Sequence, residues 1–172
     1  MLWISVCAVW IGLIFLLSSH NGTQSHGLST SVARIIAKAM YPDFGAWSMT
    51  EQTEWIDGMD SLIRKMAHFA EYCALGMFAF PAARALLSSP RRKQPLSAFR
   101  CGMIAFYPCM AAAAADEFIQ ISSAGRVSTA ADVILDCAGV VIGIIVMGLL
   151  LSGGEASGGN AAAARRKKHR NA

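Results

Sequence analysis

Residues 130–151, AADVILDCAGVVIGIIVMGLLL, form an apolar run that is interrupted by two acidic side chains, Asp132 and Asp136. About 20 to 22 helical residues, at about 1.5 Å each, cover the roughly 30 Å hydrocarbon core of a bilayer, so the run predicts a membrane-spanning helix. The whole chain has the same character, because 55% of its 172 residues are hydrophobic and only 15 Lys+Arg and 11 Asp+Glu are present. This composition excludes an ordinary soluble domain, a multi-domain enzyme and a disordered chain.

Three further apolar stretches lie at about residues 1–17, 66–87 and 96–115. The first has no Lys or Arg before it and no A-x-A-like site after it, so a retained helix is favoured over a signal peptide. The sequence therefore predicts an all-α, polytopic membrane protein. Its membrane domain, residues 1–151, is expected to be a four-transmembrane-helix bundle.

The distribution of charge predicts the orientation of these spans. Most Lys and Arg residues lie around the 88–97 loop and in the tail, residues 152–172, whereas the acidic residues gather at the other ends of the spans. By the positive-inside rule, both termini and the 88–97 loop are cytoplasmic, and the 18–65 and 116–129 loops face outward.

The tail combines a Gly, Ser and Ala linker with a terminal RRKKHR cluster, and a disordered segment is expected there. Beside a membrane, such a cluster is better explained by attraction to anionic lipid than by nucleic-acid binding. The five cysteines have no C-x-x-C spacing and fall inside apolar segments, which argues against a zinc cage or a disulfide framework.

The first outer loop is predicted to contain two amphipathic interfacial helices. One begins near Leu28, with Ser29, Thr30 and Ser31 as candidate caps, and stops before Pro42. The second is capped by Thr50 and leads directly into the span at 66–87. The second helix is expected to anchor the second span at the membrane interface.

Polar and ionisable side chains gather at the outer ends of the second, third and fourth spans. They are Lys65, His68, Glu71 and Tyr72 of the second span, Asp116, Glu117 and Gln120 of the third, Arg126 of the next connection, and Asp132 and Asp136 of the fourth. The order of the spans places all of them at similar depth, with Asp136 about 9 Å below the outer boundary. A carboxylate costs a few kcal/mol there unless it is paired, wetted or protonated, so these residues are expected to face one another.

Two glycines continue the stripe of acids along the fourth span. Gly139 and Gly143 form a G-x-x-x-G pattern, which allows a neighbouring helix to approach closely. Helix packing is the role that the spacing favours for both.

The polar residues suit acid–base chemistry on an anionic head group. His68 with Glu71, Asp116 or Glu117 are the candidate catalytic acid–base groups. The candidate substrate-binding residues are Lys65, Tyr72, Gln120, Arg126, Asp132 and Asp136, with Lys65 and Arg126 as the anion holders. Three alternatives stay open: a binding site without turnover, polar side chains that only hold the helices together, and a small transporter or proton relay.

The same residues include possible metal ligands. Histidine and carboxylates are suitable ligands, but no H-E-x-x-H or D-D-x-x-D spacing is present. The sequence therefore predicts no metal site and no cofactor, and its pattern does not define an oligomeric state.

Four stretches of the chain resemble the VanZ-like family of small integral membrane proteins in order and spacing. They are RKMAHFAEYCALG at 64–76, DEFIQ at 116–120, GR at 125–126 and DVILDCAGVVIG at 132–143. The resemblance implies a four-helix protein of the bacterial plasma membrane that is associated with the cell envelope, because the founding member gives low-level resistance to the glycopeptide teicoplanin. It does not supply a reaction, and the resistance itself is not transferred to this chain.

The partners that the resemblance implies are membrane lipid and either a lipid-linked envelope component or a glycopeptide-related ligand; no nucleic acid is expected. One position departs from the family pattern. Asp136 stands where members often have Asn, which adds a charge to the cluster.

Overall fold

The computed structural model describes residues 1–19, 22–88, 97–121 and 130–170, and side chains within 1–19, 27–88, 97–120 and 130–152. The elements in these ranges are α1 (Leu2–Ser18), α2 (Gly22–Met40), the 3₁₀ turn η1 (Phe44–Ala46), α3 (Met49–Leu87), α4 (Ala98–Ile121) and α5 (Ala130–Arg170). The described residues include no strand, which confirms the all-α fold class.

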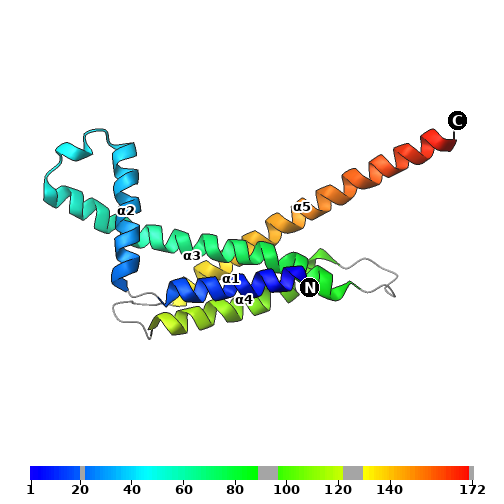
Figure 1. Ribbon diagram of the computed structural model, residues 1–172, viewed down its shortest axis with the longest axis horizontal. Coiled ribbons are helices and arrows are strands. Elements are labelled where there is room, and N and C mark those ends of the chain that lie inside the picture. Colours follow the sequence, from blue (N-terminus) through cyan, green and yellow to red (C-terminus); the bar gives the residue numbers. More distant parts are fainter. Residues whose placement is uncertain (20–21, 89–96, 122–129, 171–172) are drawn as a thin grey trace.

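Helix α3 organises the fold, since it packs against α1, α2, α4 and α5. Figure 1 shows α1, α3, α4 and the first part of α5 running side by side as a bundle, while α2 crosses α3 at the end of the bundle away from the N-terminus. The far part of α5 leaves the bundle at the opposite end. We call the end that carries α2 the head end.

The interior of the bundle is built from a few large side chains and many small ones. Ile14, Tyr72, Leu75 and Val140 are fully buried. The helices approach one another through small buried residues, which are Ala79, Ala83, Ala105, Cys109, Ala112 and Ala113. This composition brings α3, α4 and α5 close together and leaves little space between their backbones.

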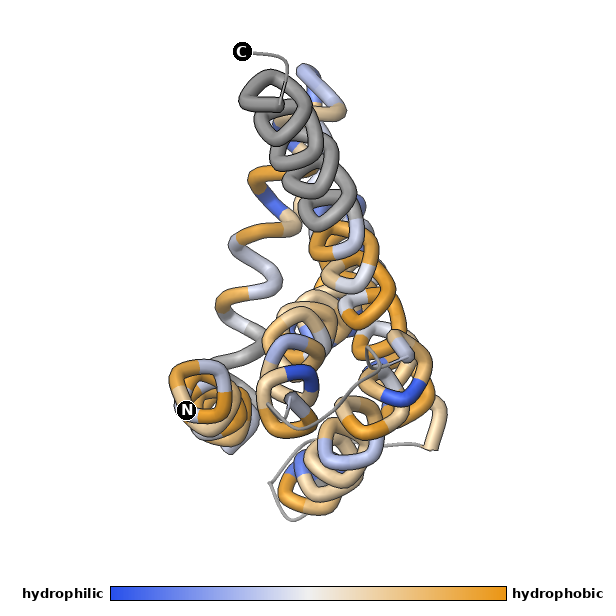
Figure 2. Tube along the Cα trace, turned by 90° about the vertical axis from the view of Figure 1, so that its right-hand side faces the viewer, coloured by the Kyte–Doolittle hydropathy of each residue, from blue (hydrophilic) through white to orange (hydrophobic). Residues whose placement is uncertain are grey.

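Many large apolar side chains of the bundle are exposed. The backbone traces of its helices are largely orange in Figure 2, the colour of hydrophobic residues. Leu13, Ile104, Ile145 and Leu149 are among those exposed. An apolar surface of this extent marks a membrane or partner interface. The molecule is therefore a helical protein with the surface of a membrane protein.

Among the residues that the structure describes, two helices are long and apolar enough to cross a membrane by length and composition, α4 over Ala98–Gln120 and α5 over Ala130–Ser152. Only 22% of each apolar window is buried within the molecule, so these residues face outward and do not form a soluble core. Helix α1 is apolar but shorter, and the predicted span at 66–87 is the second half of α3. Two of the four expected spans thus meet this criterion.

A second, smaller core lies at the head end, between α2, η1 and the beginning of α3. Ala33, Ala37, Phe44 and Ile56 are buried there. Aromatic rings that contact one another surround this core, and they belong to Tyr41, Phe44, Trp47 and Trp55. The 18–65 segment therefore contains helices, as the sequence indicates, but their boundaries differ from those expected.

Helix α2 begins at Gly22 and not near Leu28, so Ser29, Thr30 and Ser31 do not cap it. The hydroxyls of Thr30 and Ser31 donate to Gly27 O inside the helix. Because both hydroxyls donate to a carbonyl of the preceding turn, they do not compete for backbone amides, and the helix continues through these residues.

Ser48, and not Thr50, caps α3. The Ser48 hydroxyl accepts from the Glu51 amide while the Glu51 carboxylate accepts from the Ser48 amide at 2.8 Å, which is a complete capping box. From this start α3 runs without a break into the bundle, so that one helix links the head end to the membrane domain.

The C-terminal segment also differs from the expectation, because α5 continues to Arg170. The prediction of a disordered tail over residues 152–172 is not confirmed. The segment follows directly on an already formed helix, and its Ala161–Ala164 run consists of the best helix-forming residue.

Candidate functional site

The middle of α3, the end of α4 and the start of α5 bring a set of polar side chains together inside the bundle, near the head end. We call this set the polar cluster: His68, Glu71 and Tyr72 from α3, Asp116, Glu117 and Gln120 from α4, and Asp132 and Asp136 from α5. Asp116 is 0% exposed and Asp136 is 1% exposed, so both carboxylates are fully inside the protein.

His68, Asp116 and Asp136 form the centre of the polar cluster. One ligand atom from each of these three side chains lies within 4.8 Å of the other two. The Nδ1 atom of His68 is 4.0 Å from Asp116 Oδ2 and 3.9 Å from Glu71 Oε2. The imidazole therefore lies within ion-pair distance of carboxylates on two different helices.

The two buried aspartates have few hydrogen-bond partners. Gln120 Nε2 donates to Asp116 Oδ2 at 3.0 Å. Within the part of the chain that the structure describes, Asp116 Oδ1 and both carboxylate oxygens of Asp136 have no hydrogen-bond partner. Buried polar atoms without partners are rare and costly, so these three oxygens are the most unusual feature of the site.

The potential at Asp136 is strongly negative, since Glu117, Asp116, Asp132 and Glu71 all lie close enough to act on its charge. Lys65 lies 3.6 Å from Asp132 and is 52% exposed. It therefore occupies the rim of the polar cluster and pairs with the outermost acid. The other expected anion holder, Arg126, lies outside the described residues.

Tyr72 forms the inner boundary of the polar cluster. Its side chain is 0% exposed, and its hydroxyl donates to Ala112 O of α4 at 3.5 Å. Below this residue the bundle interior is apolar, with Leu75 and Val140 as its nearest large side chains along the two helices. Tyr72 therefore closes the polar cluster toward the apolar core.

Close backbone contact between α3 and α5 sets the depth of Asp136. A Cβ at Gly139 would lie 2.5 Å from Phe69 O, and one at Gly143 would overlap Cys73 O. In the other direction, a Cβ at Gly76 would overlap Val140 O. Glycines on both helices thus allow contact that no larger residue would permit, and the turn that carries Asp136 is held against α3.

Sequence reasoning did not single out Gly76 or Trp10. Gly76 lies two turns beyond His68 on α3. A glycine inside an apolar helix usually allows close packing, and this feature of the sequence could have indicated Gly76. The Trp10 Nε1 atom of α1 donates to Glu71 O at 2.9 Å and its ring meets Phe78 edge-on. Nothing in the spacing of α1 indicates this hydrogen bond.

A second polar contact, also missed, lies at the head end. The Ser29 hydroxyl of α2 donates to Asp60 of α3, which pairs with Arg64 Nη2 at 2.7 Å. Asp60 is 5% exposed and Ser29 is also 5% exposed. This contact fixes α2 to α3 and does not reach the polar cluster.

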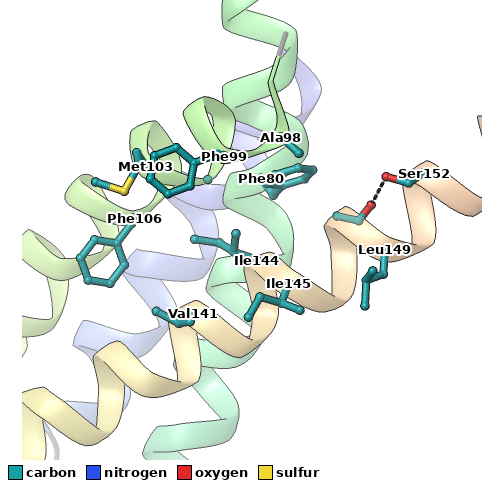
Figure 3. A pocket seen from close by; sticks show the side chains of 12 residues that line it. Phe80, Ala98, Phe99, Met103, Phe106, Val141, Ile144, Ile145, Leu149 and Ser152 are labelled. Atoms are coloured by element: carbon teal, nitrogen blue, oxygen red, sulfur yellow. Dashed lines mark hydrogen bonds between the residues drawn. The ribbon is translucent and has the colours of Figure 1, made fainter.

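An apolar groove of about 580 Å³ opens between α4 and α5 (Figure 3). It is lined by Phe80, Ala98, Phe99, Gly102, Met103, Phe106, Val141, Ile144, Ile145, Gly148, Leu149 and Ser152. The hydroxyl of Ser152 donates to Gly148 O at 2.8 Å, so the only polar side chain of the lining is already satisfied. The groove is suited to a hydrocarbon chain.

A family model described as VanZ/LLP1 matches residues 3–151. The match includes the whole bundle, the head-end helices and every residue of the polar cluster. No curated protein and no solved structure matches the chain.

Proposed function

We propose that this chain, which belongs to the VanZ/LLP1 family, binds a lipid-linked cell-envelope component in the bacterial plasma membrane and acts on its head group. The head group occupies the polar cluster at the outer leaflet, and the hydrocarbon chain lies in the groove between α4 and α5. The juxtaposition of His68 with the buried carboxylates of Asp116 and Asp136 carries this proposal.

All four bundle segments cross the membrane in this proposal, with both termini in the cytoplasm. Arg84 near the end of α3 and Arg100 near the start of α4 belong to the end of the bundle opposite α2, where the N-terminus also lies (Figure 1). The positive-inside rule assigns this end to the cytoplasm. The head end, with the polar cluster beneath it, then faces the outer side.

The pattern of unpartnered oxygens supports a ligand site over a purely structural role. Polar residues that only hold helices together gain stability by pairing, and the described residues give Asp136 no such pair. A head group with hydroxyl or amide donors would supply the missing hydrogen bonds. The free energy lost by burying the carboxylate would then be offset by ligand binding.

The groove supports the lipid part of the proposal. Val141 at its near end is five residues from Asp136 on α5, which is about 7.5 Å of helix rise. A head group in the polar cluster can therefore extend its chain along α5 into the groove. Because the lining is apolar, the groove contributes binding energy without selecting the head group.

His68 is the expected general acid or base. It is 23% exposed, whereas Asp116 is fully buried, so the imidazole is the member of the central group that a ligand can reach. Glu71 and Asp116 on either side stabilise its charged form as a proton moves.

The experiment compares envelope lipids and peptidoglycan precursors by mass spectrometry in cells that lack the protein. Complementation uses wild type, His68→Ala, and Asp57→Asn, an exposed change on α3 outside the polar cluster, at matched membrane levels. We expect one species to accumulate in the deletion and to return to normal with wild type and Asp57→Asn, but not with His68→Ala. Identical profiles in all strains, with unchanged glycopeptide sensitivity, would refute the proposal.

A further inference from the structure

The geometry points to a binding site for one divalent transition-metal ion, Zn²⁺ or Mn²⁺, formed by His68, Asp116 and Asp136. These three residues come from three different helices, and one ligand atom from each lies within 4.8 Å of the other two. Metal–ligand bonds of about 2.0–2.2 Å place neighbouring ligand atoms about 3–4 Å apart, so side-chain adjustments of about 1 Å close the three atoms onto an ion.

An independent observation points to a ligand at this place. Asp136 is 1% exposed and neither of its oxygens has a hydrogen-bond partner among the described residues. Asp116 is 0% exposed, and its Oδ1 also has no hydrogen-bond partner among the described residues. Buried carboxylates are normally paired or bound to a metal, because an isolated buried charge is very costly.

The charge balance favours a divalent ion over an organic cation. Two carboxylates that lie this close repel each other, and three more acids act on Asp136 from nearby. Lys65 does not relieve this repulsion, since it pairs with Asp132 at the rim. An ion with two positive charges neutralises Asp116 and Asp136 together.

The donor set limits the identity of the ion. One imidazole nitrogen with two carboxylate oxygens suits Zn²⁺ or Mn²⁺, while Mg²⁺ and Ca²⁺ prefer oxygen ligands alone. Cys137 follows Asp136 in the sequence but is not a member of the three-residue group, so thiolate-dependent ions such as Cu⁺ are not favoured.

Three protein ligands leave at least one coordination position for another group. Gln120 Nε2 donates to Asp116 Oδ2, and such an outer contact holds a carboxylate ligand in place. If the proposed function holds, the open position binds an anionic oxygen of the lipid head group, which would explain how an acid-rich cluster accepts a phosphate. With the ion bound, His68 acts as its ligand, and Glu71, 3.9 Å from the imidazole, takes the acid–base role. The metal site itself does not rest on that function.

The test measures metal directly on the full-length protein in detergent. The purified protein is stripped with chelator, dialysed against Zn²⁺ or Mn²⁺, washed, and analysed for metal by mass spectrometry. We expect about one ion per chain for wild type. Removal of a residue that only hydrogen-bonds a metal ligand typically lowers metal affinity by about 10–100-fold. Asp136→Asn and His68→Ala each change a ligand itself, so we expect a larger loss of affinity.

Two controls keep the result interpretable. Asp132→Asn removes an acid of the same helix outside the three-residue group and should keep its metal, which excludes a general effect of negative charge. Thermal unfolding should shift upward on adding metal for wild type but not for Asp136→Asn, provided both accumulate in the membrane. Wild type without bound metal, or full occupancy in Asp136→Asn, would overturn the metal site while leaving the head-group proposal to its own test in cells.

Discussion

The carboxylates of Asp116 in α4 and Asp136 in α5 have oxygens within 4.8 Å of each other in the interior of the bundle. Neither residue is more than 1% exposed. Two acids so placed destabilise the empty bundle, and a protein keeps such an arrangement when it serves binding or catalysis. The relationship makes Asp136 the most informative residue for measurements of stability.

Asp136→Asn should stabilise the protein when chelator is present and no ligand is bound. The amide has the same shape but no charge to bury, so we expect the free energy of unfolding to rise by about 1–3 kcal/mol. Thermal or denaturant unfolding in detergent, followed by tryptophan fluorescence, measures this change. Asp132→Asn, whose carboxylate pairs with Lys65 and is partly exposed, should change stability by less than about 1 kcal/mol. A loss of stability in Asp136→Asn would show that the carboxylate is satisfied in the unliganded protein.

Gly143→Ala should separate α5 from α3, because the added Cβ would overlap the backbone carbonyl oxygen of Cys73. Overpacking typically costs about 1–3 kcal/mol, and a backbone contact cannot be relieved by a side-chain rotation. Gly148→Ala is the matched control on the same helix, since a Cβ there would meet Phe80 at 3.5 Å, an ordinary contact. Unfolding measurements on both variants test the prediction, and equal stability of the two would contradict it.

Helical periodicity and span order were sufficient to place His68, Asp116 and Asp136 at similar depth, because residue counts along a helix convert directly into height. They predicted that the polar faces of these helices meet, but they did not show which other surfaces of α3 and α5 come into contact. The contact of Gly76 with Val140 depends on how α3 and α5 are rotated about their axes, and only packing fixes that rotation. Likewise, no pattern in α1 predicts that Trp10 bonds to Glu71.

The sequence also did not predict where the helices of the 18–65 segment begin. Polar residues near position 28 suggest a start, but the hydroxyls of α2 bond within their own helix or to α3, and the helix begins at Gly22. The second amphipathic helix was expected to lead directly into residues 66–87, and α3 is a single element from Met49 to Leu87, but its cap is Ser48 and not Thr50. The membership of the VanZ family, by contrast, is confirmed over residues 3–151.

The start of α3 should fray at acid pH. Hydrogen bonds from the Ser48 side chain and backbone hold the pKa of Glu51 below its ordinary value of 4.5. Since the folded pKa is below the unfolded one, the contribution of Glu51 is present above pH 4.5 and is lost as the pH falls through the lower folded pKa.

Amide hydrogen-exchange protection at Glu51 and Gln52 measures this fraying. We expect protection there to fall on acidification in wild type and in Glu54→Gln, an exposed change on the same helix. In Glu51→Gln, protection should already be reduced at neutral pH and should depend little on pH. A pH-dependent loss that persists in Glu51→Gln would assign the effect to another group.

Filling the groove between α4 and α5 should weaken lipid binding without disturbing the polar cluster. Ile145 lines the groove and is 53% exposed, so Ile145→Trp places a large ring in the space that the hydrocarbon chain is proposed to occupy. If the ring displaces one segment of the hydrocarbon chain, about 1.4 kcal/mol of binding free energy is lost, which corresponds to about tenfold weaker lipid binding. Ile142→Trp is the matched control, because Ile142 is 45% exposed on the same helix and does not line the groove. Native mass spectrometry of lipid retained by each purified variant compares them. Equal retention by both variants would show that the chain lies elsewhere on the bundle, whereas selective loss in Ile145→Trp would place it between α4 and α5.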